Sequence, residues 1–290
     1  MPNTWTPAPR TVIEAFLPAD GEAPLRLIYD TANAAGIEDQ PLRLAIRRML
    51  TAGEVTRTGR GRSGGLGLTP AGRARLDRDR LGLHLALDQD RGRARWDGRW
   101  HLLAVSAPES ERALRDALRR DLAEAGAAAV STGLYVSPHD LGPLLPPGGA
   151  ANLVRATATG LDVRGTTDDR AVAELLWPAA PIVAGYAALE QALAEDDPPA
   201  SNNPPAADGP PAGSDVTAVL VRQIRLADAL DRAMRHDPLI PPELRAAPWP
   251  PSLVRRAWLD AWTALTARLP AETLYRGWLT AGSRGGAGTK

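Results

Sequence analysis

Residues 39–69 read DQPLRLAIRRMLTAGEVTRTGRGRSGGLGLT, and this stretch decides the fold that we predict for the N-terminal part of the chain. Its apolar residues recur at the spacing of one helix face, namely Leu42, Ala45, Ile46, Met49 and Leu50. Gly53 ends that helix, and EVTRT and LGLT follow as two short β-like runs around a loop of glycine and arginine. The stretch therefore predicts a helix packed on a core, followed by a basic β-hairpin.

The flanking sequence completes a known order of elements. Residues 10–17 and 24–36 have apolar positions at helical spacing, and Pro70 opens a fourth helical pattern after the hairpin. Two helices, a turn, a third helix and a basic hairpin are the order of a winged helix-turn-helix. We therefore predict a DNA-binding domain over residues 1–82, with residues 83–95 as a connector.

The third helix has an arginine-rich outer face, which suits the major groove because arginine pairs with guanine O6 and N7. Arginines on the hairpin can neutralise phosphates. The candidates are Gln40, Arg43 and Arg47 for base edges, Arg48 at the edge of that face, and Arg57, Arg60 and Arg62 for phosphates.

Further along, Arg73, Arg75, Arg78 and Arg80 alternate with Asp77 and Asp79, so we expect them to be solvated. A winged helix that binds only protein remains an alternative.

Charge and composition narrow the class of protein. The formal net charge is zero, yet residues 41–80 hold ten arginines against three acidic residues. The absence of cysteine excludes disulfides, cysteine-ligated zinc and a thiol nucleophile, and the four histidines are widely spaced, so we predict no metal and no catalytic residues. With so few candidate catalytic side chains, we expect that the protein is not an enzyme. No long apolar run and no secretory pattern are visible, so we expect a cytoplasmic protein.

Residues 96–194 predict a second, α+β domain of ferredoxin-like type. WDGRWHLLAV (96–105), AVSTGLYVSP (129–138) and NLVRATATG (152–160) predict strands, and 108–125, 168–177 and 181–194 predict helices, with a short helix over 138–145. Trp96 and Trp100 could line a ligand pocket, but packing is the favoured interpretation.

The C-terminal third begins with residues 195–214, a stretch of proline, alanine and acidic residues that we predict to be a disordered linker. Residues 215–290 then predict an α-helical C-terminal domain. Its two helical patterns flank the proline-rich segment HDPLIPPELRAAPWPPS, residues 236–252.

These segments together resemble the PaaX-type repressors, regulators of the catabolism of phenylacetate and related aromatic acids. Three parts carry the resemblance: the helix and wing, with Arg43, Arg48 and RTGRGRSGGLGLT (57–69); the string WDGRW (96–100); and DPLIPPELRAAPWP (237–250). It covers nearly the whole chain outside the linker. Two departures are Leu66-Gly67, where the family wing usually has tyrosine before Leu-Thr, and Pro251, where the family has glycine.

The resemblance implies a sequence-specific transcriptional repressor. It implies a homodimer on an inverted-repeat operator in double-stranded DNA, a Cas2-like middle domain for dimerisation, and release by an aryl- or acyl-CoA thioester such as phenylacetyl-CoA. It assigns no effector-binding residues. The enzymatic alternative is a metal-dependent Cas2-like nuclease, which would want an acidic ligand at the end of the first strand, where HLLAVS ends in Ser106.

Overall fold

The computed structural model describes residues 6–108, 110–145, 149–195 and 213–269. The chain forms two compact units. The first comprises Met1–Asp77, Leu189–Asp231 and Ala257–Lys290, and the second comprises Arg78–Ala188 and Arg232–Arg256. The C-terminal helical segment, predicted as a domain of its own, is thus divided between the two units, because its helices pack on partners far away in the sequence. Most of the predicted linker over 195–214 lies outside the described residues.

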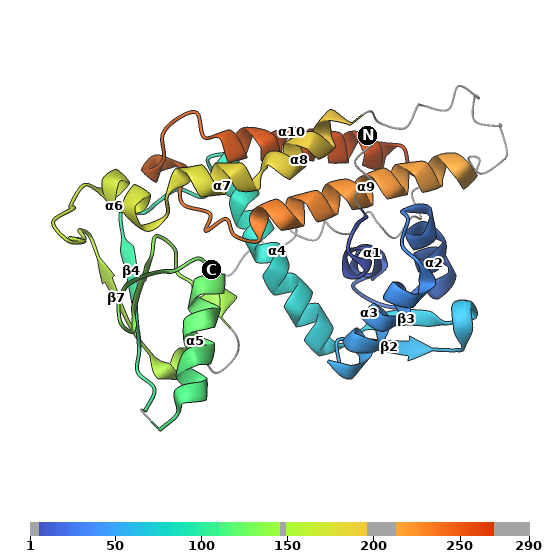
Figure 1. Cartoon of the computed structure of the whole chain (residues 1–290), viewed down its shortest axis with the longest axis horizontal. Coiled ribbons are helices and arrows are strands. Elements are labelled where there is room, and N and C mark those ends of the chain that lie inside the picture. Colours follow the sequence, from blue (N-terminus) through green and yellow to red (C-terminus); the bar gives the residue numbers. More distant parts are fainter. Residues whose placement is uncertain (1–5, 109, 146–148, 196–212, 270–290) are drawn as a thin grey trace, which may run out of the picture. The chain divides into compact units, whose positions relative to one another are not determined.

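The first unit contains the predicted winged helix, whose elements are blue to cyan in Figure 1. They are α1 (Pro9–Phe16), β1 (Glu22–Pro24), α2 (Leu25–Ala34), α3 (Asp39–Thr51), β2 (Val55–Thr58), the 3-10 turn η1 (Gly61–Ser63), β3 (Gly65–Leu68) and the first part of α4 (Pro70–Asp90), which belongs to the second unit from Arg78 on. The three strands form an antiparallel sheet in the order β1-β3-β2. Strand β1 was not predicted. Pro24, which the sequence favoured as the first residue of a helix, instead pairs with Gly65 of β3.

The core of the winged helix contains the apolar faces of α1, α2 and α3. Its buried side chains include Val12, Ile13 and Phe16 of α1, Leu25 and Ile28 of α2, and Leu42, Ile46 and Met49 of α3. Helix α1 packs against both α2 and α3. The apolar stripe predicted for α3 is confirmed, and its burial fixes the orientation of the helix.

The C-terminal helices α9 (Gly213–Met234) and α10 (Pro250–Ala267) contribute to the same unit. The buried carboxylate of Asp228 accepts hydrogen bonds from the backbone N–H of Ala8 and the hydroxyl of Thr11, both at 2.9 Å. These groups lie at the N-terminus of α1, where backbone N–H groups lack partners within the helix. A side chain of α9 therefore caps the first helix of the winged helix. In addition, the indole of Trp258 in α10 donates to the carbonyl of Leu226 in α9 at 3.0 Å.

The second unit is built on a four-stranded antiparallel sheet, β5-β6-β4-β7. The strands are β4 (Trp100–Val105), β5 (Ala128–Ser131), β6 (Leu134–Ser137) and β7 (Leu153–Ala158), and α5 (Arg112–Glu124) connects β4 to β5. This order and connection confirm the ferredoxin-like prediction. The helix predicted over 138–145 is only the 3-10 turn η2 (Gly142–Leu144), and the predicted connector over 83–95 is helical as far as Asp90 because α4 continues.

Three short helices follow the sheet, namely α6 (Asp169–Leu176), α7 (Ala179–Gly185) and α8 (Ala187–Ala194), and the further 3-10 turns are η3 (Gly149–Asn152) and η4 (Pro242–Leu244). In the part of the chain that the structure describes, no single helix has the length and apolar content of a membrane span. The bent pair Asp169–Leu176 and Ala179–Ala194 meets those two criteria only jointly.

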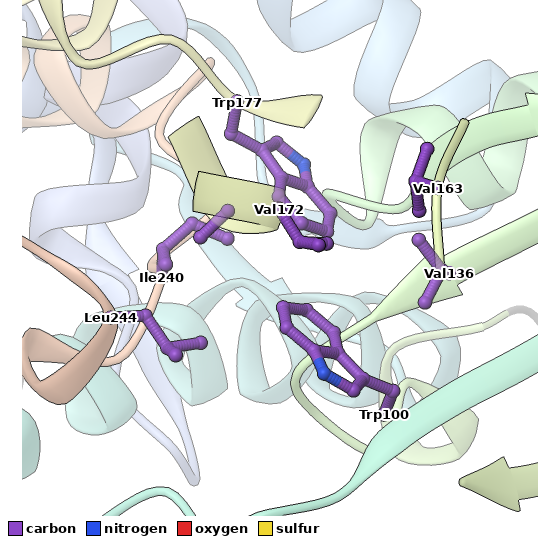
Figure 2. Packing of buried hydrophobic residues seen from close by; sticks show 8 residues of the cluster. Trp100, Val136, Val163, Val172, Trp177, Ile240 and Leu244 are labelled. Carbon is purple, nitrogen blue, oxygen red and sulfur yellow. The ribbon is translucent and has the colours of Figure 1, made fainter. Parts of the chain in front are cut away.

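Trp100 belongs to a hydrophobic cluster in the second unit (Figure 2). Its ring lies nearly parallel to that of Trp177, with centroids 6.3 Å apart, and Trp96 meets it edge-on at 5.4 Å. Ile240 and Leu244, from the segment between α9 and α10, belong to the same cluster. Packing is therefore the role that the structure gives Trp96 and Trp100.

The second unit also contains a buried charged group, the guanidinium of Arg255. It donates to both carboxylate oxygens of Asp90, at 2.6 and 2.7 Å, to Asp237 at 3.1 Å and to the hydroxyl of Tyr186 at 2.7 Å. Burial alone would lower the pKa of Arg255, but the hydrogen bonds with Asp90 and the neighbouring carboxylates outweigh it and raise the pKa. Arg255 is therefore charged, and it joins α4, the residue between α7 and α8, and the segment between α9 and α10.

We predict that Arg255→Ala lowers the free energy of unfolding by about 3–5 kcal/mol, because it leaves the buried carboxylates of Asp90 and Asp237 without their cation. Urea denaturation followed by circular dichroism measures this. The matched control is Arg256→Ala, since Arg256 is the exposed neighbour and its removal should cost within about 0.5 kcal/mol. Equal losses in the two variants would contradict the role given to Arg255.

Candidate nucleic-acid interface

Helix α3 presents two chemically different faces. Leu42, Ile46 and Met49 are buried. The outward face, which we call the α3 front, consists of exposed residues: Gln40, Arg43, Leu44, Arg47 and Arg48. The structure thus brings the predicted base-edge candidates together on one accessible surface. Leu44 also belongs to this surface, although it was not among the predicted contacts.

The wing is the β2–β3 hairpin with η1 at its tip. Glycine is required at two positions there. Gly59 has a positive φ of 67°, and a Cβ on Gly64 would lie 2.3 Å from the carbonyl oxygen of Thr58. The backbone N–H of Leu25 donates to the carbonyl of Gly64 at 2.9 Å, which attaches the hairpin to the start of α2. The glycine-rich string therefore makes a tight tip that places Arg57, Arg60 and Arg62 within a short segment.

Arg62 is held by the helices rather than extended from the wing. Its guanidinium donates to Asp39 at 2.8 Å, to Asn33 at 3.1 Å and to Asp30 at 3.2 Å. It also lies 5.0 Å from the centre of the Tyr29 ring. These contacts tie the wing to α2 and to the first residue of α3. The charge of Arg62 is thus partly offset, and its assignment as a phosphate contact stays a prediction.

The remaining candidates differ in how far their charge is neutralised. Arg43 forms a long, exposed ion pair with Asp39 at 3.4 Å. Arg57 donates to the carbonyl of Gly61 at 3.1 Å, a contact that leaves its charge uncompensated. Arg47, Arg48 and Arg60 form no ion pair within the described part of the chain. Uncompensated positive charge therefore lies on the α3 front and on the wing.

Arg75 differs from the expectation that the arginines of α4 are solvated. It forms ion pairs with Glu14 and Glu54, and Arg10 pairs with the same two carboxylates. The side chain of Arg75 is 27% exposed, which shows that it lies partly inside this cluster. Glu14 and Glu54 are distant in sequence, so the nearby Asp77 and Asp79 suggested the wrong environment. The cluster joins α1, the residue before β2, and α4.

Part of the second unit is similar to a known protein family. Residues 93–146 match the family model described as the PaaX protein central Cas2-like domain. The middle of this chain is thus similar to the central domain of PaaX proteins. The matched range contains WDGRW and the strands β4, β5 and β6, so the resemblance to the PaaX-type family and the predicted fold class are both confirmed.

A solved structure supports the fold of the chain as a whole. The Uncharacterized protein Rv0674 from Mycobacterium tuberculosis is similar with 25% sequence identity and a TM-score of 0.53. The match covers 89% of this chain and 94% of the Mycobacterium chain. No curated protein sequence matches the chain significantly. The likeness therefore extends beyond the middle domain, while the neighbour's description adds no activity.

We predict that Asp39 titrates below the usual range for aspartate, because hydrogen bonds from Asn33 and Arg62 hold its pKa down. Its folded pKa lies below the unfolded value of about 3.9. The stabilisation is therefore complete above the unfolded pKa and is lost as the pH falls through the folded one. An NMR titration of the Asp39 carboxyl measures this pKa. Arg62→Ala should raise it, whereas Arg60→Ala should leave it unchanged. The same Asp39 titration in wild type and Arg62→Ala would refute the contact.

Proposed function

We propose that this chain is a sequence-specific DNA-binding transcriptional regulator. The observation that carries the proposal is the uncompensated arginine charge on the α3 front and the wing. A basic helix with an apolar back suits the major groove, and a basic glycine-rich hairpin suits the adjacent phosphates. The family match supports a PaaX-type regulator at the level of the family.

The contacts divide by chemistry into two groups. Arg43 and Arg47 are one helical turn apart, so both can face the same stretch of groove and pair with guanine, and Gln40 can pair with adenine. Arg57 and Arg60 on the wing, with Arg48 at the edge of the α3 front, suit phosphate oxygens. Base contacts determine specificity, whereas phosphate contacts determine affinity and register.

The finer proposal follows from the family resemblance. The regulator is a cytoplasmic repressor that acts as a homodimer on an inverted repeat, with half-sites about one turn of DNA, or about 34 Å, apart. An aryl- or acyl-CoA thioester such as phenylacetyl-CoA releases it. A ligand can do this only if it binds the DNA-free arrangement of the two reading heads more tightly than the bound one.

We predict that base-edge and phosphate variants separate in their salt dependence. The probe is a duplex selected by the full-length protein from a random-sequence library. Arg43→Ala and Arg47→Ala should each cost about 1–3 kcal/mol of discrimination against altered bases. Arg57→Ala and Arg60→Ala should weaken binding to all duplexes and reduce the salt slope by about 1 each. Fluorescence anisotropy at several salt concentrations measures both quantities.

The control for this experiment is Arg112→Ala, which removes one positive charge from the exposed face of α5 and should change neither quantity. Unchanged DNA binding in the Arg43→Ala/Arg47→Ala double variant would favour an adaptor that binds protein only. Wild-type binding that is indifferent to sequence would refute the proposed specificity.

We further predict that an acyl-CoA thioester releases the operator. A gel shift on the DNA upstream of the protein's own gene, with a panel of acyl-CoA thioesters including phenylacetyl-CoA, measures this, and free coenzyme A is the control. Release by one thioester but not by coenzyme A is the expected result. Persistence of the complex with every thioester would contradict the effector assignment, and Mg²⁺-dependent cleavage of the duplex would instead favour the nuclease.

A further inference from the structure

Leu44 is an exposed apolar side chain in the middle of the α3 front. Its exposed fraction is 44%, while Leu42 and Ile46 on the same helix are 0% and 4% exposed. It lies one helical turn from Gln40 and Arg48 and three residues from Pro41 and Arg47, so its neighbours on the helix surface are polar except for Pro41. Leu44 therefore belongs to the surface that faces the groove in the proposed function and not to the core.

The surroundings of Leu44 argue against a general hydrophobic docking patch. Such patches are contiguous apolar areas, whereas here a single leucine is flanked by one proline, a glutamine and arginines. The other large exposed apolar side chains of the described residues lie on other elements, namely Leu81, Val154, Leu175 and Leu253. A partner of Leu44 must therefore offer a small apolar group within a polar and anionic surface.

The major groove of DNA has one such group, because the 5-methyl of thymine is the apolar feature among the hydrogen-bonding base edges. We propose that Leu44 reads a thymine by packing against its 5-methyl group. This inference rests on the proposed function and deepens it by naming a base in the half-site. One helical turn rises about 5.4 Å, and successive bases lie about 3.4 Å apart. The thymine thus lies within about two base pairs of the bases read by Gln40 and Arg47.

The test removes each partner of the contact in turn, the 5-methyl group of thymine and the branched end of the Leu44 side chain. Duplexes selected from a random-sequence library by the full-length protein are remade with deoxyuridine in place of each thymine in turn, which deletes only the 5-methyl group. Wild-type affinity should fall about fourfold at one thymine of the half-site, the weight of one buried methyl group. In Leu44→Ala the same replacement should have no effect, while replacements elsewhere act as in the wild type.

Two controls keep the result specific to Leu44. Leu175→Ala truncates a leucine on α6 that is 49% exposed, and this variant should keep the wild-type dependence on the methyl group. The thermal midpoint of Leu44→Ala should equal that of the wild type, because the side chain is not in the core.

The possible failures are distinguishable. If the library yields no preferred duplex, the proposed function fails and the inference fails with it. If a preferred duplex emerges but every thymine replacement acts equally on wild type and Leu44→Ala, the proposed function stands and the thymine assignment is overturned.

Discussion

Burial of one stripe of α3 is the constraint on which the functional surface depends. Leu42, Ile46 and Met49 lie in the core of the winged helix, which is closed by α1 and α2. Residues of a helix are arranged at fixed angles, so a buried stripe leaves no freedom in which residues point outward. The α3 front, with its arginines and Leu44, is therefore a consequence of core packing. Any account of base recognition by this chain begins with those three apolar side chains.

Ion pairs, and not the number of arginines alone, determine where net positive charge remains in the first unit. Arg62 is engaged with Asp30 and Asp39, and Arg10 and Arg75 share Glu14 and Glu54. Because these acids neutralise arginines away from the α3 front, the basic excess of residues 41–80 overstates the charge available to a polyanion. What remains uncompensated is concentrated where the helix and the wing face outward. The pairing also gives the wing a defined attachment to α2 and α3, which reduces the ordering cost of binding.

Elements that depend on interactions between residues close in sequence were predicted correctly, whereas contacts between residues distant in sequence were not. Helical periodicity and glycine punctuation are local signals, so α1, α2, α3 and both wing strands are found within a few residues of their predicted positions. Partners that are distant in sequence leave no such signal. Asp228 caps a helix 220 residues away, and Arg255 is buried against Asp90 while its neighbour Arg256 is exposed. The string LVRRAW cannot show which of its two arginines has a partner 165 residues earlier. The three-residue strand β1 was missed because it is too short to show a period.

Two of the three motifs that carried the family resemblance have a structural explanation in the second unit. Trp100 of WDGRW and Ile240 and Leu244 of DPLIPPELRAAPWP belong to one hydrophobic cluster (Figure 2). Asp237 of the latter motif accepts from both Arg255 and Tyr186, and Arg245 donates to the carbonyl of Trp177 at 2.7 Å. Two strings about 140 residues apart thus specify one packed core. These two motifs therefore report how the second unit is packed. The third motif, which includes Arg43 and Arg48, lies on the α3 front and the wing, where the choice of operator is made in the proposed function.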